Sequence, residues 1–175
     1  MVEEHIHDFK EHKATRESPY HFVDSGLPNV YLSGIKYRTC RLCGRQSADI
    51  PAIKQLMEVI ARTVVIREAA LNGAEIRFLR KRLGKKSSEF ARIIGVTIEQ
   101  VSRWENDHNP PEESADKLIR IFYSMLSGDR KLREKIDEDI ECWLSTLPGE
   151  GQIADIRAKL STNREWKTES AAVGA

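Results

Sequence analysis

Five polar side chains lie close together between Thr97 and Arg103 of this 175-residue chain. Thr97 can cap a helix, and Gln100 three residues later completes the Ser/Thr-x-x-Glu/Gln capping box. In a helix that begins there, Glu99, Ser102 and Arg103 face away from the apolar side. An arginine can donate two hydrogen bonds to O6 and N7 of guanine, and a glutamate can accept one from the amino group of cytosine. The spacing therefore places base-reading chemistry on one helix face.

Each of these side chains also has a purely structural interpretation. Glu99 can stabilise the positive end of the helix dipole, and Arg103 can be solvated or bind a phosphate. Trp104 follows Val101 by three residues, which favours a place in the core over stacking on a sugar.

A second short helix precedes this one and completes a recognisable unit. Phe90, Ala91 and Ile94 put apolar side chains on one helix face, and Gly95 suits the left-handed residue that ends a helix. Two short helices joined by a tight turn form a helix-turn-helix, which places its second helix in the major groove. An ordinary helical hairpin with a solvated polar face remains the alternative.

The sequence of this unit resembles a known family. Gly95-Val96-Thr97, followed by Val101-Ser102-Arg103-Trp104-Glu105-Asn106, resembles the Cro/cI (Xre-type) helix-turn-helix family, and residues 71–84 are similar to its first helix. That family usually has glutamine at the position of Ser87, where it supports the recognition helix and contacts a phosphate. In this chain, Lys85 and Lys86 can neutralise the charge of that phosphate instead. The predicted DNA-binding residues are Lys85, Lys86, Ser87, Thr97, Ile98, Glu99, Gln100, Ser102 and Arg103.

Metal-binding residue types occur nearer the start of the chain. Three cysteines are present, and two of them form Cys40-Arg41-Leu42-Cys43. An odd number of cysteines with this spacing favours a reducing compartment and a metal knuckle over a disulfide framework.

The N-terminal third resembles a second family module. Residues 20–32, then Cys40-Arg41-Leu42-Cys43-Gly44 and Ile50-Pro51, resemble the YgiT-type module of MqsA-type antitoxins. Members of that family join a small zinc-binding domain to an Xre-type helix-turn-helix, neutralise a ribonuclease toxin and repress their own operon as dimers. The resemblance implies a sequence-specific transcriptional repressor that is the antitoxin of a type II toxin–antitoxin pair. The alternatives are a stand-alone Xre-type regulator without a toxin partner and a protein-binding adaptor.

The zinc site of that module is incomplete in this chain. Tetrahedral zinc needs four ligands, typically two Cys-x-x-Cys pairs, and only Cys40 and Cys43 are present here. His5 and His7, or His12 and His21, are the histidines that can complete a two-cysteine, two-histidine site. The alternative is a degenerate knuckle that keeps its tight turn without metal.

Composition limits the remaining functional classes. The net charge is +1 and 40% of the residues are hydrophobic, which excludes a wholesale polyanion binder and allows a packed core. Residues 73–108 nevertheless carry eight basic and five acidic side chains, a patch suited to DNA. His21, Asp24 and Ser25 are too close in sequence to converge as a catalytic trio, so we expect no enzyme. The polar start and the lack of a long apolar run predict a cytoplasmic protein without a membrane span.

The expected architecture is mainly α: an Xre-type five-helix domain preceded by a small β-rich, zinc-finger-like module. Short strands are predicted at residues 20–23, 30–32 and 35–40, and a helix is predicted from Pro51. The predicted segments are a flexible N-terminus (1–18), the YgiT-like module with a connecting helix (19–68), the helix-turn-helix domain (69–127), a C-terminal helix (128–147) and a tail (148–175). Apolar stripes over residues 118–126 and 132–147 predict a homodimer surface, and the alternative is that they form the core of the monomer. The residues of these stripes are Leu118, Ile119, Phe122, Tyr123, Leu126, Ile136, Ile140, Trp143 and Leu144.

Overall fold

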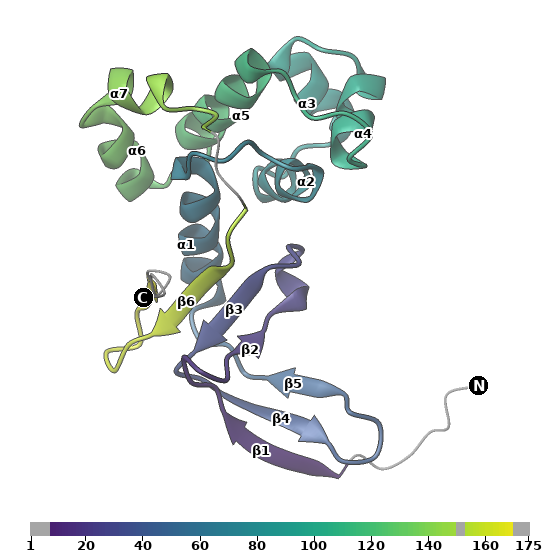
Figure 1. The fold of residues 1–175 in the computed structure, drawn as a ribbon, viewed down its shortest axis with the longest axis vertical. Coiled ribbons are helices and arrows are strands. Elements are labelled where there is room, and N and C mark those ends of the chain that lie inside the picture. The colour runs from purple at the N-terminus through teal and green to yellow at the C-terminus, as the bar shows by residue number, and fades with distance from the viewer. Residues whose placement is uncertain (1–7, 150–152, 170–175) are drawn as a thin grey trace. The chain divides into compact units, whose positions relative to one another are not determined.

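The computed structural model describes residues 8–149 and 153–169, which divide into two compact units (Figure 1). The first unit comprises residues up to Ile60 together with those from Asp155 onwards, and the second comprises Ala61–Ala154. The described residues form seven α-helices and seven strands. The expectation of a mainly α protein is therefore wrong, because the fold is mixed α/β.

An antiparallel three-stranded sheet forms one part of the β-rich unit. Its strand order is β1-β4-β5, made by Phe9–Lys13, Lys36–Cys40 and Gln46–Ala48. Strand β4 confirms the strand predicted at residues 35–40. Strand β1 lies where a flexible N-terminus was predicted, and its register places Phe9 opposite Cys40.

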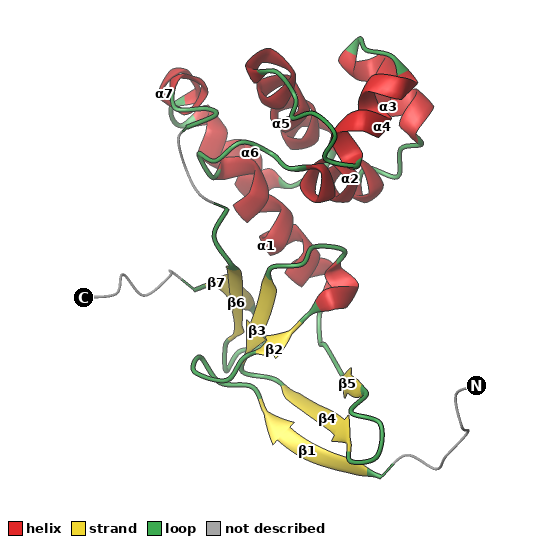
Figure 2. Cartoon of the chain, turned by 45° about the vertical axis from the view of Figure 1, so that its right-hand side comes forward, coloured by secondary structure: helices red, strands yellow, loops and turns green. Residues whose placement is uncertain are grey.

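A four-stranded sheet forms the other part of this unit, and both ends of the chain contribute to it (Figure 2). Its order is β2-β3-β6-β7, made by Tyr20–His21, Val30–Ser33, Ile156–Leu160 and Trp166–Thr168. Strands β2 and β3 lie where strands were predicted. Strands β6 and β7 lie where the sequence suggested only a tail, and β6 pairs with β3 in parallel.

Helix α1 (Ile53–Ile66) begins in the β-rich unit and ends in the helical one. The indole of Trp166 fixes β7 to the start of this helix, because its Nε1 donates to the Pro51 carbonyl at 2.8 Å. The backbone amide of Trp166 also donates to the Gln55 side chain.

The second unit is helical. Beyond the end of α1 it contains α2 (Gly73–Arg82), α3 (Ser87–Ile94), α4 (Ile98–Glu105), α5 (Glu113–Leu126), α6 (Arg130–Asp137) and α7 (Ile140–Ser145). Its core includes Ile76, Leu79, Phe90, Val101 and Ile119, each at most 1% exposed. Three residues of the predicted dimer surface, Ile119, Tyr123 and Ile136, are buried within the single chain, so their assignment to that surface is wrong. The single helix expected at the end of this unit is two helices, since Asp139 caps α7 by accepting from the Cys142 amide.

Candidate nucleic-acid interface

Helices α3 and α4 form the predicted helix-turn-helix (Figure 2). Gly95 ends α3 with a φ of 80°, in the left-handed region that glycine adopts without a side-chain clash. The amides of Gly95 and Val96 both donate to the Ala91 carbonyl, which closes the turn. Phe90, Ala91 and Ile94 are buried as the spacing predicted.

Helix α4 begins at the predicted cap. The Thr97 hydroxyl accepts a hydrogen bond from the Gln100 amide at 3.1 Å, which satisfies one of the free amides at the helix start. Trp104 is only 3% exposed, so its assignment to the core is confirmed. Thr97, Glu99 and Arg103 are exposed and Gln100 is half-buried.

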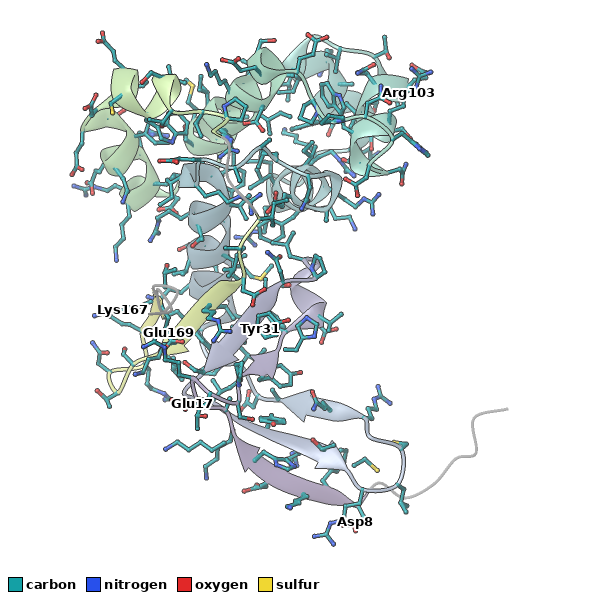
Figure 3. The ribbon with its side chains drawn as sticks, in the orientation of Figure 1. Asp8, Glu17, Tyr31, Arg103, Lys167 and Glu169 are labelled. Atoms are coloured by element: carbon teal, nitrogen blue, oxygen red, sulfur yellow. The ribbon has the colours of Figure 1, made fainter. Side chains whose placement is uncertain are left out.

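The outward face of α4 therefore carries the residues predicted to read bases. Figure 3 shows Arg103 projecting from α4 away from the helical core. No ion pair of Arg103 is found within the described residues, so its guanidinium is available to a partner. Ser102 is exposed beside it, and Ile98 is 49% exposed near the start of the helix.

Glu99 is held in its ionised form. Hydrogen bonding to its own backbone amide, and then to the Thr97 hydroxyl, lowers the pKa of its carboxyl, and the charge of Arg103 acts in the same direction. An ionised carboxylate is the acceptor that a cytosine amino group requires.

The start of α3 holds the predicted phosphate contacts. Lys86 is exposed, and Lys85 and Ser87 are half-buried. The Glu89 carboxylate accepts from the Lys86 amide at 3.1 Å and fixes the backbone there. A serine hydroxyl and two lysines at a helix start are suited to a phosphate, because the helix dipole is positive at this end.

Two arginines of the predicted basic patch have an internal role instead. Arg80 on α2 donates from Nε and Nη2 to the two carboxylate oxygens of Glu105 on α4. Its Nη1 also donates to the Lys85 carbonyl at 2.9 Å. Arg77 donates to the Glu105 carbonyl and to the Asn106 side chain. These arginines position α4 and the loop before α3, so the patch available to DNA is smaller than the sequence suggests.

A buried arginine on α5 joins the end of α1 to the domain. Arg120 is fully buried, donates to Asp116 at 2.5 Å, and also donates to the carbonyls of Val65 and Ala69. Asp116 in turn accepts from the Leu71 amide at 2.7 Å. Arg120 thus supplies hydrogen-bond donors to carbonyls at the end of α1 and in the loop that follows it, which the helix itself leaves unpaired.

The sequence did contain a signal for this network. Asp116 and Arg120 are spaced by four residues and lie on the same helix face as the apolar Ile119 and Tyr123. A charge pair on the apolar face of an amphipathic helix indicates a buried ion pair.

The possible zinc ligands lie in different environments. Cys40 is buried and Cys43 is exposed. His12 stacks on Tyr37, and His21 stacks on Tyr31, in the other sheet, with its Nε2 at 2.7 Å from the Pro28 carbonyl oxygen. The described ranges, 8–149 and 153–169, contain no cluster of three or more possible metal ligands.

His5 and His7 lie outside the described residues. The chain that follows them is nevertheless anchored beside the cysteines, because the Arg41 amide donates to the Asp8 carbonyl at 2.8 Å. The pairing of β1 with β4 therefore places Asp8, the first described residue, beside the Cys40–Cys43 turn.

Two further features concern other functional classes. The Ser25 hydroxyl donates to the Phe22 carbonyl and accepts from the Leu27 amide, so it stabilises a turn. Among the described residues, no helix combines the length and the apolar character needed to cross a membrane.

The comparisons with known proteins concern the helical unit. Residues 76–122 match the helix-turn-helix family HTH_3. The chain is 35% identical over 60 residues to the uncharacterized HTH-type transcriptional regulator YiaG of Escherichia coli K12, and equally to the proteins of that name in strains O6:H1 and O157:H7. The match covers 34% of this chain, which spans 62% of the length of those relatives. No solved structure matches the chain. Residues 76–122, from α2 into α5, are therefore an Xre-type helix-turn-helix domain.

Proposed function

We propose that this protein is a sequence-specific DNA-binding transcriptional repressor. The observation that carries the proposal is the outward face of α4, where Glu99, Ser102 and Arg103 are exposed on a helix whose other face is buried. A helix held in this way can enter the major groove without disturbing the core.

The proposed contacts follow from the chemistry of each side chain. Arg103 donates two hydrogen bonds to a guanine, and Glu99 accepts one from a cytosine. Ile98 offers an exposed apolar surface to a thymine methyl group. Lys85, Lys86 and Ser87 bind phosphates and set the register, while Thr97 and Gln100 define the start of the recognition helix.

Selection of binding sites from random duplexes, followed by titration at several salt concentrations, tests this function. Arg103→Ala should reduce the preference for the selected site by about 5-fold to 100-fold, the loss of one bidentate base contact. Arg130→Ala is the matched control, because Arg130 is an exposed arginine of the same unit on α6. Equal discrimination by Arg103→Ala and the wild type would contradict the assignment of α4.

We propose that the repressor binds as a homodimer. Met125, Leu126 and Ile140 are large apolar residues with 61%, 51% and 44% of their surface exposed. Met125 and Ile140 also line one cavity of about 320 Å³ formed by α5, α6 and the start of α7. A second copy around a two-fold axis would cover them and set two recognition helices about 34 Å apart, which matches an inverted-repeat operator.

We propose the antitoxin role on the resemblance of the N-terminal residues to the YgiT-type module. The division into two units supports it, because one unit can bind DNA while the other binds a toxin. Co-expression with the product of an adjacent toxin-sized gene tests this role. A stable complex is the expected result. Repression without any such partner favours a stand-alone regulator, and failure to bind DNA at low salt favours a protein-binding adaptor.

We propose zinc as the metal of the N-terminal module, with Cys40, Cys43, His5 and His7 as ligands. The support is the hydrogen bond from the Arg41 amide to the carbonyl of Asp8, which places the first described residue beside the cysteine turn. Elemental analysis of untagged protein should give about one zinc per chain, since four ligands make one tetrahedral site. His5→Ala with His7→Ala should release the metal as Cys43→Ser does, while His21→Ala should not. Absence of zinc from the wild-type protein would refute the site.

A further inference from the structure

A cavity in the β-rich unit has no role in the proposed function. It encloses about 370 Å³ and is lined by β4 and by the turn between β6 and β7. Lys36 and Arg38 line it from β4, and Arg164 lines it from the turn. Within the part of the chain that the structure describes, none of these three cations forms an ion pair. The guanidinium of Arg38 lies over the Phe9 ring, 5.5 Å from its centroid, and this contact uses the face of the guanidinium and not its N–H groups. The N–H donors of the three cations therefore have no carboxylate partner here and can bind an anion. We name this space the β4 cavity.

A close backbone contact brings the two sides of the β4 cavity together. Gly34, just before β4, has a φ of 81°, and a Cβ at this position would lie 2.6 Å from the Leu160 carbonyl oxygen. Only glycine allows this approach, because any side chain would collide with the end of β6. The turn at residues 161–165 is consequently fixed beside the start of β4.

Arg164 has an unusual backbone conformation for its residue type. Its φ is 62°, in the left-handed region, and its amide donates to the Ser161 carbonyl at 2.9 Å to close the turn. A residue other than glycine in this conformation costs of order 1 kcal/mol or more. Such strain is concentrated at sites where the side chain is used, and the side chain of Arg164 lines the β4 cavity.

The acidic residues that line the β4 cavity indicate which kind of anionic ligand it can bind. Glu11 and Asp49 line the same cavity. Carboxylates repel a bare anion but accept hydrogen bonds from sugar hydroxyls. Cations next to such acceptors match a ligand that has a phosphate at one end and hydroxyl groups at the other. The volume lies in the range of about 300–1,000 Å³ that is usual for small-ligand sites.

We propose that the β4 cavity binds a phosphorylated sugar, either free or as part of a nucleotide. The guanidinium groups of Arg38 and Arg164 hold the phosphate, and Lys36 adds a point charge. Glu11 and Asp49 accept hydrogen bonds from the sugar hydroxyls. The site lies wholly in the β-rich unit and does not depend on DNA binding by α4.

Calorimetric titration of the full chain with ribose 5-phosphate, adenosine 5′-monophosphate and inorganic phosphate tests the proposal. Both sugar phosphates should bind at least tenfold more tightly than inorganic phosphate. A tighter complex with the nucleotide than with ribose 5-phosphate would identify a nucleotide site, and equal affinities would identify a sugar-phosphate site.

Arg164→Gly separates binding from folding. It relieves the left-handed backbone, so the melting temperature should stay the same or rise while sugar-phosphate binding weakens at least tenfold. Lys36→Ala should also weaken binding. Lys10→Ala is its control, because Lys10 lies on β1 opposite Thr39, on the other face of the same sheet. Absence of binding at 10 mM ligand, lack of preference over inorganic phosphate, or full affinity in Arg164→Gly would each overturn the proposal.

Discussion

Arg80 on α2 donates hydrogen bonds to both carboxylate oxygens of Glu105 on α4, with Nε–Oε1 and Nη2–Oε2 distances of 2.5 and 2.8 Å. Their side chains are 11% and 7% exposed, so the pair is largely removed from water. The same guanidinium donates to the Lys85 carbonyl. One side chain thus positions the end of the recognition helix and the loop that holds the predicted phosphate contacts.

Arg80→Met should destabilise the domain by up to about 3 kcal/mol, because it leaves the buried Glu105 carboxylate with only the more distant Arg77, whose Nε lies 3.5 Å from Oε2. Urea unfolding monitored by circular dichroism measures this loss. Lys81→Met is the control on the same helix, since Lys81 is exposed. The double variant Arg80→Met/Glu105→Met should recover part of the lost stability, because it removes both buried charges. A double variant as unstable as the sum of the single ones would show that the two residues act independently.

Glu99 should keep one charge state across the neutral range. Hydrogen bonds from its own amide and Thr97 lower its pKa below the usual 4.5, so its contribution to stability and binding is present above that pH. The contribution is lost only as the pH falls through the lowered value. We expect the preference of the protein for cytosine at the base pair that Glu99 contacts to be constant between about pH 5 and pH 8. Competition between duplexes that differ at that base pair measures this preference. Glu99→Gln should weaken the preference at every pH, and a preference that titrates near neutrality would assign it to another group.

The sequence was sufficient for α3 and α4 because their signals are local. The Gly95 turn, the Thr97 cap and the burial of Phe90, Val101 and Trp104 all follow from spacings of a few residues. The exposure of Arg103 follows from the same periodicity.

The parts that the sequence did not predict depend on contacts between distant segments. Strand β6 is short and pairs with β3 from the other end of the chain, so no turn signal connects the two. The roles of Arg77 and Arg80 could not be separated from those of Lys85 and Lys86, because a charge count does not show which cations have an internal partner. The β4 cavity likewise needs Leu160 to approach Gly34, which only the folded sheet reveals.

Trp166→Ala should unfold the β-rich unit preferentially. The side chain is 3% exposed, and its indole donates to the Pro51 carbonyl, so its removal leaves both a cavity and an unpaired acceptor. We expect a loss of about 3–5 kcal/mol. Hydrogen exchange should show deprotection of β3 and β6 with little change in α3 and α4. Lys167→Ala, at an exposed neighbouring position, is the control, and equal deprotection of both units would show that they unfold together.

Ile140→Glu should dissociate the proposed homodimer while it leaves the monomer folded. Ile140 is 44% exposed, so the substitution removes little from the core of the chain and places a charge in the proposed interface. It is a cleaner change than one at Trp143, which is half-buried and has its indole nitrogen enclosed. Ile153→Glu is the matched control, because Ile153 is 43% exposed in the same unit but does not line the cavity formed by α5, α6 and the start of α7.

Light scattering at micromolar concentration should give twice the chain mass for the wild type and for Ile153→Glu, and the chain mass for Ile140→Glu. Operator affinity should fall strongly in Ile140→Glu alone, since a monomer makes only the contacts of one half-site. Unchanged circular dichroism would show that the loss comes from dissociation and not from unfolding. A wild-type protein of monomer mass that binds a single half-site tightly would instead mean that Met125, Leu126 and Ile140 remain exposed in the functional form.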